Sequence, residues 1–186
     1  MPAASWTAWA CVPSNATPAK VLNLSLGASG ACLQSYTDTI AQVNAAGAVV
    51  VVAAGNEGLA VGTPANCAGA IAVAGVRHSG TKVGYSDLGP QIAVSAPAGN
   101  CVNSTGPCLY PLLTTSNSGS TTPVAGAAGA TYTGTGNDAS LGTSFSAPLV
   151  SGAAALMYSA NPTITPAQVL AALKATARPF PSTGFD

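Results

Sequence analysis

The sequence is poor in charge and in histidine. Only ten of its 186 residues are Lys, Arg, Asp or Glu, five of each sign, so the formal net charge is zero. Binding to phosphate backbones needs a basic footprint, and anionic membrane surfaces attract polybasic segments. This balance therefore argues against nucleic-acid and membrane partners. The sequence contains a single histidine, His78, which argues against a zinc site with several histidine ligands and leaves one candidate for a histidine base.

Long apolar runs are absent as well. The longest, AVVVVAAG over residues 48–55, is too short to cross a bilayer and has the length of a buried strand. The first residues, MPAASWTAWACVP, lack the basic start and long apolar stretch of a signal peptide. This part of the sequence therefore gives no indication of whether the protein is exported.

The five cysteines form no CxxC pair, which argues against a metal site. Cys101 and Cys108 flank the turn-rich segment VNSTGP, which can close as a local disulfide. Cys32 and Cys67 are the second candidate pair, and closing the longer loop would stabilise the fold by about 4 kcal/mol. Free, buried thiols are the alternative. Cys11 is left over, and an odd cysteine in a disulfide-type protein predicts a partner outside the sequence.

Four apolar segments predict strands, and a helical segment follows the first of them. The strand after this helix has no polar alternation, as expected when both of its faces are covered. A strand–helix–strand order predicts a parallel sheet with helices on its faces. The predicted strands are VLNLSLG (21–27, short and buried), AVVVVAAG (48–55), AIAVAGV (70–76) and QIAVSAP (91–97).

Two helices carry clear signals. In SYTDTIAQVNAAG, Ile40, Val43 and Ala46 fall on one face and Gly47 is a stop signal. In ITPAQVL, Thr165 is the expected N-cap of a helix that ends near residue 176. Its capping box is completed by Gln168, with Pro166 at the first helical position and a hydrophobic staple between Ile164 and Val169. Residues 116–140 predict an extended surface loop with weak strands at most.

The segment GTSFSAP, at residues 142–148, combines a turn with a helix start. Ser144 follows Gly-Thr and opens a helix expected to run to about Ala160. A serine there lies at the positive end of the helix dipole, beside N–H groups that can donate to an oxyanion formed when the hydroxyl attacks a carbonyl. Pro148 falls early in this helix, where little hydrogen bonding is lost. A second interpretation also stays open, in which Ser144 is only the N-cap.

The segment AAGNEG, at residues 53–58, follows the most apolar strand. Ligand sites in open parallel sheets cluster at the carboxyl ends of the strands. Asn56 offers a carboxamide N–H donor there, and the glycines beside it let a substrate backbone approach. The alternative is a turn asparagine at a strand end.

Taken in this order, VLNLSLG, VVVVAAGNEG and GTSFSAPLVSGAAAL resemble the C-terminal two-thirds of a subtilisin-like (subtilase, S8) serine peptidase domain. The likeness is greatest to secreted bacterial subtilases with cysteine-stabilised loops, and it covers most of the chain. It implies a three-layer α/β/α fold with a mostly parallel sheet whose N-terminal part is missing. Residues 1–186 would form a single, partial domain of a secreted endopeptidase.

The resemblance also assigns roles to individual residues. It makes Ser144 the acyl-forming nucleophile, and it makes Asn56 and the Ser144 N–H the two donors of the oxyanion hole. Small residues in the walls of the S1 pocket would admit a sizeable apolar or aromatic P1 side chain. One wall, which also pairs with the substrate backbone, is Ser25, Leu26 and Gly27; the opposite wall is Ala53, Ala54 and Gly55.

The sequence departs from the family where the base should be. The D-[ST]-G and H-G-T motifs that carry the family's Asp and His do not occur, and we expect them in sequence that would precede Met1. His78 is expected in a polar turn between strands, and Asp138 is expected to organise a loop. The strand at 91–97 lacks the aspartate common there, which removes one expected calcium ligand. No cofactor is predicted, and calcium enters only through the resemblance.

Two alternatives to the peptidase stay open. An intact nucleophile and oxyanion donor beside an absent base would suit an esterase that acts on soluble or polymeric esters. An unpaired Cys11 and a sheet that lacks its N-terminal strands would suit a non-catalytic module. Such a module would self-associate or pair with a missing N-terminal segment.

Overall fold

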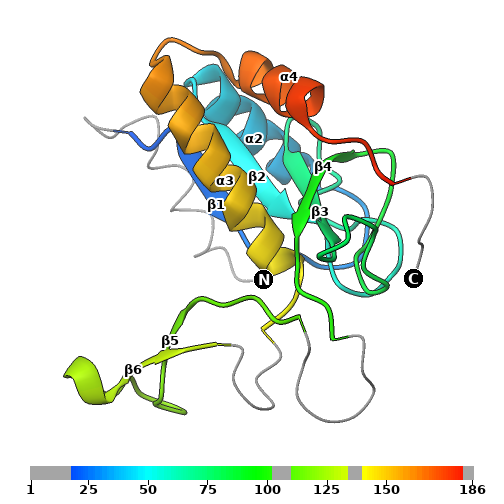
Figure 1. Ribbon diagram of the computed structural model, residues 1–186. Helices are drawn as coiled ribbons and strands as arrows, with labels where there is room; N and C mark the ends of the chain where they lie inside the picture. The colour runs from blue at the N-terminus through cyan, green and yellow to red at the C-terminus, as the bar shows by residue number, and fades with distance from the viewer. Residues whose placement is uncertain (1–17, 102–109, 134–139, 182–186) are drawn as a thin grey trace.

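The computed structural model describes residues 18–101, 110–133 and 140–181 (Figure 1). A parallel sheet with its helices comes first and a small hairpin follows, before the chain returns to the sheet with two further helices. The elements are β1 (Val21–Leu24), α2 (Gln34–Ala45), β2 (Val49–Ala53), β3 (Ile71–Val76), β4 (Ile92–Pro97), β5 (Thr115–Asn117), η2 (Gly126–Ala128), β6 (Ala130–Tyr132), α3 (Thr143–Ala160) and α4 (Pro166–Thr176).

The four main strands lie in the sheet in chain order, β1-β2-β3-β4. All three strand pairs are parallel, with Val21 opposite Val49, Val51 opposite Ile71, and Ala72 opposite Ile92 at the start of each ladder. Every residue of β2 is buried, as its unbroken apolar sequence predicts. The predicted parallel sheet is therefore confirmed.

Helices cover both faces of this sheet, because successive side chains of a strand point to opposite sides. Val50 and Val52 of β2 pack into one core cluster with buried side chains of α2. Val49, Val51 and Ala53 pack into a second cluster with side chains of α3 and α4. In Figure 1, α2 lies behind the sheet and α3 crosses in front of it. The predicted three-layer α/β/α arrangement is confirmed.

The start of α4 matches its sequence signals. Thr165 Oγ1 accepts from the backbone N–H of Gln168 at 3.3 Å, and Gln168 Oε1 accepts from the Thr165 N–H at 2.9 Å. With Pro166 in the first turn, this completes the predicted capping box. Ile164 and Val169 belong to the same apolar cluster, so the end of the chain is fixed against the sheet.

Two details of the sequence prediction are wrong. The first strand was expected to be buried, yet in β1 only Leu24 is. The reason is that β1 has a single strand neighbour, β2, within the described part of the chain. Ala46 was expected on the apolar face of α2, but it is exposed because the helix ends at Ala45 and Ala46 is its C-cap. Gly47 follows with a φ of 81°, the left-handed conformation that ends helices.

A disulfide joins Cys32, just before α2, to Cys67, just before β3. Their Cα atoms are 5.1 Å apart, and 35 positions separate them in the sequence. The predicted pair is confirmed, and the free-thiol alternative is wrong for these two residues. Cys101 is disulfide-bonded too. Its predicted partner, Cys108, lies outside the described residues, as does Cys11.

The expected surface loop at 116–140 contains weak strands. β5 and β6 pair antiparallel and form a hairpin that projects away from the main sheet (Figure 1). Residues 134–139, which include Asp138, lie outside the described part. Across the described ranges, no helix has the length and hydropathy needed to cross a membrane.

Replacing the N-cap of α4 tests the capping interpretation. Thr165→Ala should lower the free energy of unfolding by about 1 kcal/mol, because the Gln168 N–H at the helix start loses the Thr165 hydroxyl as its acceptor. Urea denaturation followed by circular dichroism measures this change. The matched control is Thr121→Ala, an exposed threonine in the hairpin, which should change the free energy of unfolding by less than about 0.5 kcal/mol. Equal effects in the two variants would contradict the assignment.

Candidate active site

The first turn of α3 is fixed to the carboxyl end of β4. Gly142 is the N-cap, with a φ of 141° that favours glycine, and its N–H donates to the Ala98 carbonyl at 2.8 Å. Ser146 Oγ donates to the Ala96 and Pro97 carbonyls at 3.0 and 3.1 Å. Ser144 is therefore inside the first helical turn, and the interpretation of Ser144 as the N-cap is wrong. Its backbone N–H lies among those that have no partner within the helix.

Asn56, at the end of β2, is oriented by Thr143. Its Oδ1 accepts from the Thr143 N–H at 2.8 Å and from Thr143 Oγ1 at 3.0 Å. Thr143 is fully buried, and its Oγ1 also accepts from the Gly55 N–H at 3.2 Å. The Asn56 oxygen is thus committed to the start of α3, which leaves Nδ2 available as a donor. A carbon placed on Gly142 would lie 3.4 Å from that nitrogen, so the amide lies along the N-cap of the helix.

Ser25, just after β1, contacts the other side of the same helix turn. Its Oγ donates to the Ser144 carbonyl at 2.7 Å, and Ser144 Oγ lies 3.5 Å from the Ser25 carbonyl. Asn23 Nδ2 donates to Ser25 Oγ at 3.0 Å and Asn23 Oδ1 accepts from Ser151 of α3. The end of β1 is therefore hydrogen-bonded to α3 at two positions, Ser144 and Ser151.

These segments surround one pocket of about 90 Å³. Five of the six residues predicted as pocket walls line it together with Ser144 and Asn56: Leu26, Gly27, Ala53, Ala54 and Gly55. The sixth, Ser25, is not in the lining but is hydrogen-bonded to Ser144. The structure thus brings together all eight predicted site residues.

Two carboxylates also line this pocket, and the sequence did not point to them. Asp87 is buried, and its Oδ1 accepts from the N–H groups of Glu57 and Leu59 at 3.0 and 2.8 Å. Glu57 Oε2 accepts from the Asn56 N–H at 2.9 Å. A carbon added to Gly55 would collide with Asp87 Oδ2 and lie 2.9 Å from Glu57 Oε2. Both carboxylates therefore lie against Gly55, and the pocket is acidic.

Comparison of the sequence with models of known protein families shows to which family the chain belongs. The family model described as "Subtilase family" (Peptidase_S8) matches residues 3–186. The chain belongs to the subtilase family. It is 42% identical over 173 residues to an extracellular protease of Xanthomonas campestris and 32% identical over 164 residues to an extracellular basic protease of Dichelobacter nodosus.

Solved structures agree with this assignment. A structure titled as proteases from Pseudoalteromonas arctica matches with a TM-score of 0.80 and 40% identity over 91% of this chain. A cold-adapted subtilisin-like serine proteinase, 21% identical, shares the fold with a TM-score of 0.65. This subtilase chain spans 26% and 24% of the two curated relatives, and 47% and 52% of the two solved chains.

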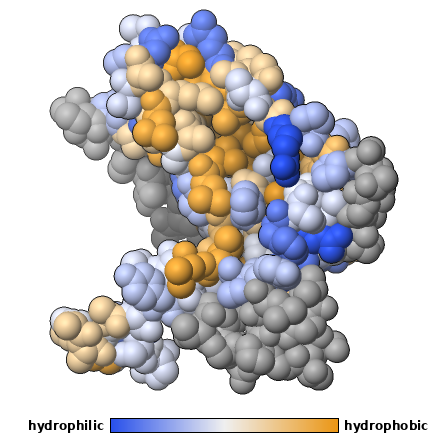
Figure 2. All heavy atoms as spheres, in the orientation of Figure 1, coloured by the Kyte–Doolittle hydropathy of each residue, from blue (hydrophilic) through white to orange (hydrophobic). Residues whose placement is uncertain are grey.

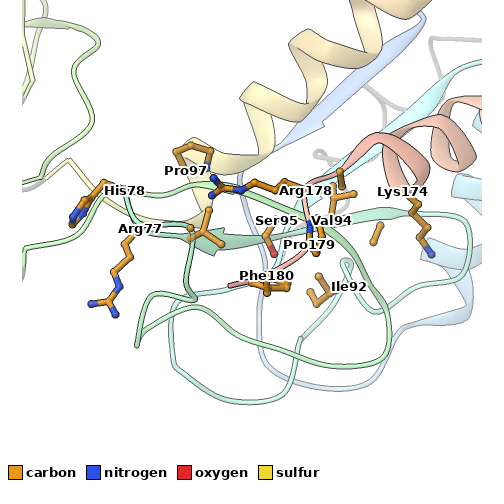
Figure 3. A pocket seen from close by; sticks show the side chains of 14 residues that line it. Arg77, His78, Ile92, Val94, Ser95, Pro97, Lys174, Arg178, Pro179 and Phe180 are labelled. Carbon is orange, nitrogen blue, oxygen red and sulfur yellow. The ribbon is translucent and has the colours of Figure 1, made fainter. Parts of the chain in front are cut away.

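No general base for Ser144 is found in the described part of this subtilase chain. The one hydrogen bond of the Ser144 hydroxyl is the 3.5 Å contact with the Ser25 carbonyl. His78 is exposed in the turn after β3, where its ring stacks on Tyr110 with centroids 3.8 Å apart. It lines a different pocket from the one that contains Ser144 (Figure 3). The prediction that His78 is a turn residue is confirmed.

The calcium expectation concerns the strand at 91–97, now β4. No Asp or Glu occurs in β4, and no group of three or more His, Cys, Asp or Glu side chains converges within the residues described. The described ranges therefore show no donor set to which a calcium ion can be assigned, and calcium binding stays a prediction from the resemblance.

Tyr85 holds the loop that carries the N-cap of α3. Its hydroxyl donates toward the Ala98 and Gly99 carbonyls, at 2.6 and 2.8 Å. The Ala98 carbonyl is the same group that accepts from Gly142. Burial raises the pKa of Tyr85 from 10.0 to about 12, with a smaller opposite effect from the Gly142 backbone. The neutral phenol is thus part of the support beneath Ser144.

This pKa predicts a loss of stability in alkali. The folded state holds the Tyr85 proton more tightly than the unfolded state does. The contribution to stability is therefore complete below about pH 10 and is lost as the pH rises toward about 12. Urea unfolding at several pH values in this window should give a shallower decline for Tyr85→Phe than for the wild type. Tyr132→Phe, at an exposed position, should keep the wild-type slope, and a Tyr85→Phe slope equal to it would contradict the prediction.

Proposed function

We propose that this subtilase chain carries the nucleophile half of a secreted serine endopeptidase that cleaves polypeptides through a Ser144 acyl-enzyme. The observation that carries the proposal is the fixed placement of Asn56 beside the first turn of α3 by two hydrogen bonds from Thr143. Membership in the family supports the reaction class. Secretion is supported by the two relatives named extracellular proteases and by the Cys32–Cys67 disulfide.

In this proposal each residue has one step. Ser144 Oγ attacks the carbonyl carbon of the scissile peptide bond and gives its proton to a base. The oxygen of the tetrahedral intermediate accepts from Asn56 Nδ2 and from the Ser144 N–H, both of which are held in place before the charge develops. The carbon–nitrogen bond then breaks, and the base returns the proton to the leaving amine. Water hydrolyses the acyl ester by the reverse sequence of proton transfers.

We propose that the base comes from a polypeptide segment outside this sequence, which carries the family's Asp and His motifs. β1 has a free edge within the described sheet, and this edge ends at Ser25, beside Ser144. Apolar side chains also gather over α3 in Figure 2, where Leu149 and Leu156 are 51% and 73% exposed. An open strand edge next to exposed leucines can accept a further strand.

The two other hypotheses have less support. An esterase would use the same nucleophile and oxyanion donors, but the relatives named above are proteases. A purely non-catalytic module would not need Asn56 to be oriented. Both stay predictions, and the labelling experiment below separates the second from the peptidase.

The proposal is tested by labelling with a fluorophosphonate probe and locating the adduct by peptide mass mapping. The chain is labelled alone and after co-refolding with the segment that precedes the matched region in the Xanthomonas campestris relative. The second sample should label at Ser144 roughly a hundredfold faster or more, the size of a general-base contribution. Ser144→Ala should abolish labelling in both samples.

Controls separate the possible outcomes. Ser159→Ala, at an exposed position of the same helix, should label like the wild type. His78→Ala should have no effect, and loss of labelling in that variant would place the base within this chain. Labelling that persists in Ser144→Ala would contradict the nucleophile assignment.

The acidic pocket changes the expected substrate class. The sequence predicted an apolar or aromatic P1 side chain, but the pocket of about 90 Å³ is lined by Glu57 and Asp87 and, among the described residues, by no cationic side chain. A slender lysine stem with a terminal charge suits such a pocket better than a phenyl ring does. We therefore propose a preference for lysine at P1.

Peptidyl phosphonates that differ only at P1 test this preference in the reassembled protein. The lysine probe should label Ser144 about tenfold faster than the phenylalanine probe, the size of one ion pair in a partly buried site. Glu57→Gln and Asp87→Asn should each reduce this ratio, because they remove charge while keeping an acceptor. Asp38→Asn on α2, outside the pocket, is the control and should leave the ratio unchanged. A phenylalanine probe that labels faster in the wild type would contradict the proposal.

A further inference from the structure

A second cavity lies away from Ser144, along the outer edge of β4. It has a volume of about 480 Å³ and is bordered by β4, the turn that follows β3, the end of α4 and the chain just after α4 (Figure 3). We call it the β4 groove. None of Ser144, Asn56 and the predicted S1 walls lines it. It is therefore separate from the candidate active site.

Most of the positively charged side chains of this protein lie in the β4 groove. Arg77, Lys174 and Arg178 line it, which is three of the five cationic side chains in the sequence. None of the described acids, Asp38, Glu57 and Asp87, lines it. In Figure 3, Arg77 and Lys174 lie toward opposite ends of the groove and Arg178 lies between them. Such a distribution favours an elongated anionic ligand over a compact one.

The central cation, Arg178, lies against Gly80. Gly80 has a φ of 89°, and a side-chain carbon on it would collide with the Arg178 guanidinium. Neither Arg178 nor Lys174 has an ion pair or a hydrogen bond with any of the residues that the structure describes. Both side chains are exposed, so their donors are free to meet a ligand.

The floor of the groove suits an extended peptide. Ile92, Val94 and Phe180 supply apolar surface, and Phe180 is 59% exposed. Among the described strands, β4 pairs only with β3, so its outer edge has no strand partner. Ser95 lines the groove, and its hydroxyl has no hydrogen bond with a described residue. Pro97 has no N–H to donate, so strand pairing would be confined to the residues before it.

We propose that the β4 groove binds an extended acidic peptide, which lies along β4 as an added strand. Backbone hydrogen bonds to the free edge would hold the peptide, and alternate side chains would face the groove. Carboxylates of the peptide would pair with Lys174 and Arg178, while its apolar side chains would pack on Phe180 and Val94. The inference does not rest on peptidase activity, because none of its residues belongs to the Ser144 site.

Fluorescence anisotropy tests the proposal with a labelled short peptide of alternating Glu and Val. The Ser144→Ala protein is used, so that cleavage cannot interfere. Binding should be saturable and weakened by NaCl, and the same peptide with Lys in place of Glu should bind at least about tenfold more weakly. Equal binding of the two peptides would overturn the proposal.

Charge-reversal variants locate the site. Lys174→Glu combined with Arg178→Glu should weaken binding of the acidic peptide by roughly tenfold or more, since two attractions become repulsions. Lys20→Glu, a charge reversal outside the groove, is the matched control and should leave affinity within about twofold. Circular dichroism spectra identical to that of the wild type establish that the variants are folded. Unchanged affinity in the double variant would overturn the assignment.

A third arm separates strand addition from simple charge pairing. The acidic peptide with alternate backbone nitrogens methylated keeps its charges but loses donors for a strand ladder. It should bind at least about tenfold more weakly than the parent peptide. Equal affinity of the methylated and parent peptides, or competition by inorganic phosphate at equal concentration, would overturn the proposed strand.

Discussion

The site depends on one cluster of part-buried hydrogen bonds, in which Thr143 joins α3 to the end of β2. Thr143 offers its backbone N–H and its hydroxyl to Asn56 Oδ1, while the same hydroxyl accepts from the Gly55 N–H. Because Thr143 is fully buried, a break in this cluster would leave its N–H and hydroxyl without partners and without water. The cluster therefore fixes the direction of the Asn56 amide and the position of Ser144 together.

The sheet makes this cluster possible. Both faces of β2 are buried, because side chains of α2 pack on one face and side chains of α3 pack on the other. Its chain ends in small residues, Ala53, Ala54 and Gly55, where a larger side chain would fill the pocket. β2 is thus buried along its length, while a pocket remains accessible at its carboxyl end, as expected for open parallel sheets.

Features encoded within one short segment could be predicted from the sequence. The apolar run of β2 and the capping box of α4 each specify their structure through neighbouring residues, and both were correct. Asn56 and Ser144 were proposed from the sequence because each lies in a short motif next to a predicted element. The burial of β1 was not predictable in this way, because it depends on which strand lies beside it.

The contacts that sequence reasoning missed join distant segments. Asp87 reaches the loop of Glu57 and Leu59 from about thirty positions away, and no local pattern marks it as part of the pocket. Tyr85 supports Gly142 through the Ala98 carbonyl, an arrangement that needs the folded loops to be known. Thr143 was visible in its motif, but only the structure shows that it orients Asn56.

The hydrogen bonds that assemble the site come from the ends of β1, β2, β4 and α3, not from the middle of any of them. Segment ends open locally at a lower free energy than the sheet as a whole. Heating should therefore separate the first turn of α3 from β2 before the core melts. The useful lifetime of the nucleophile at high temperature is then set by a few contacts at the rim of the sheet, and stabilising the core alone would not extend it.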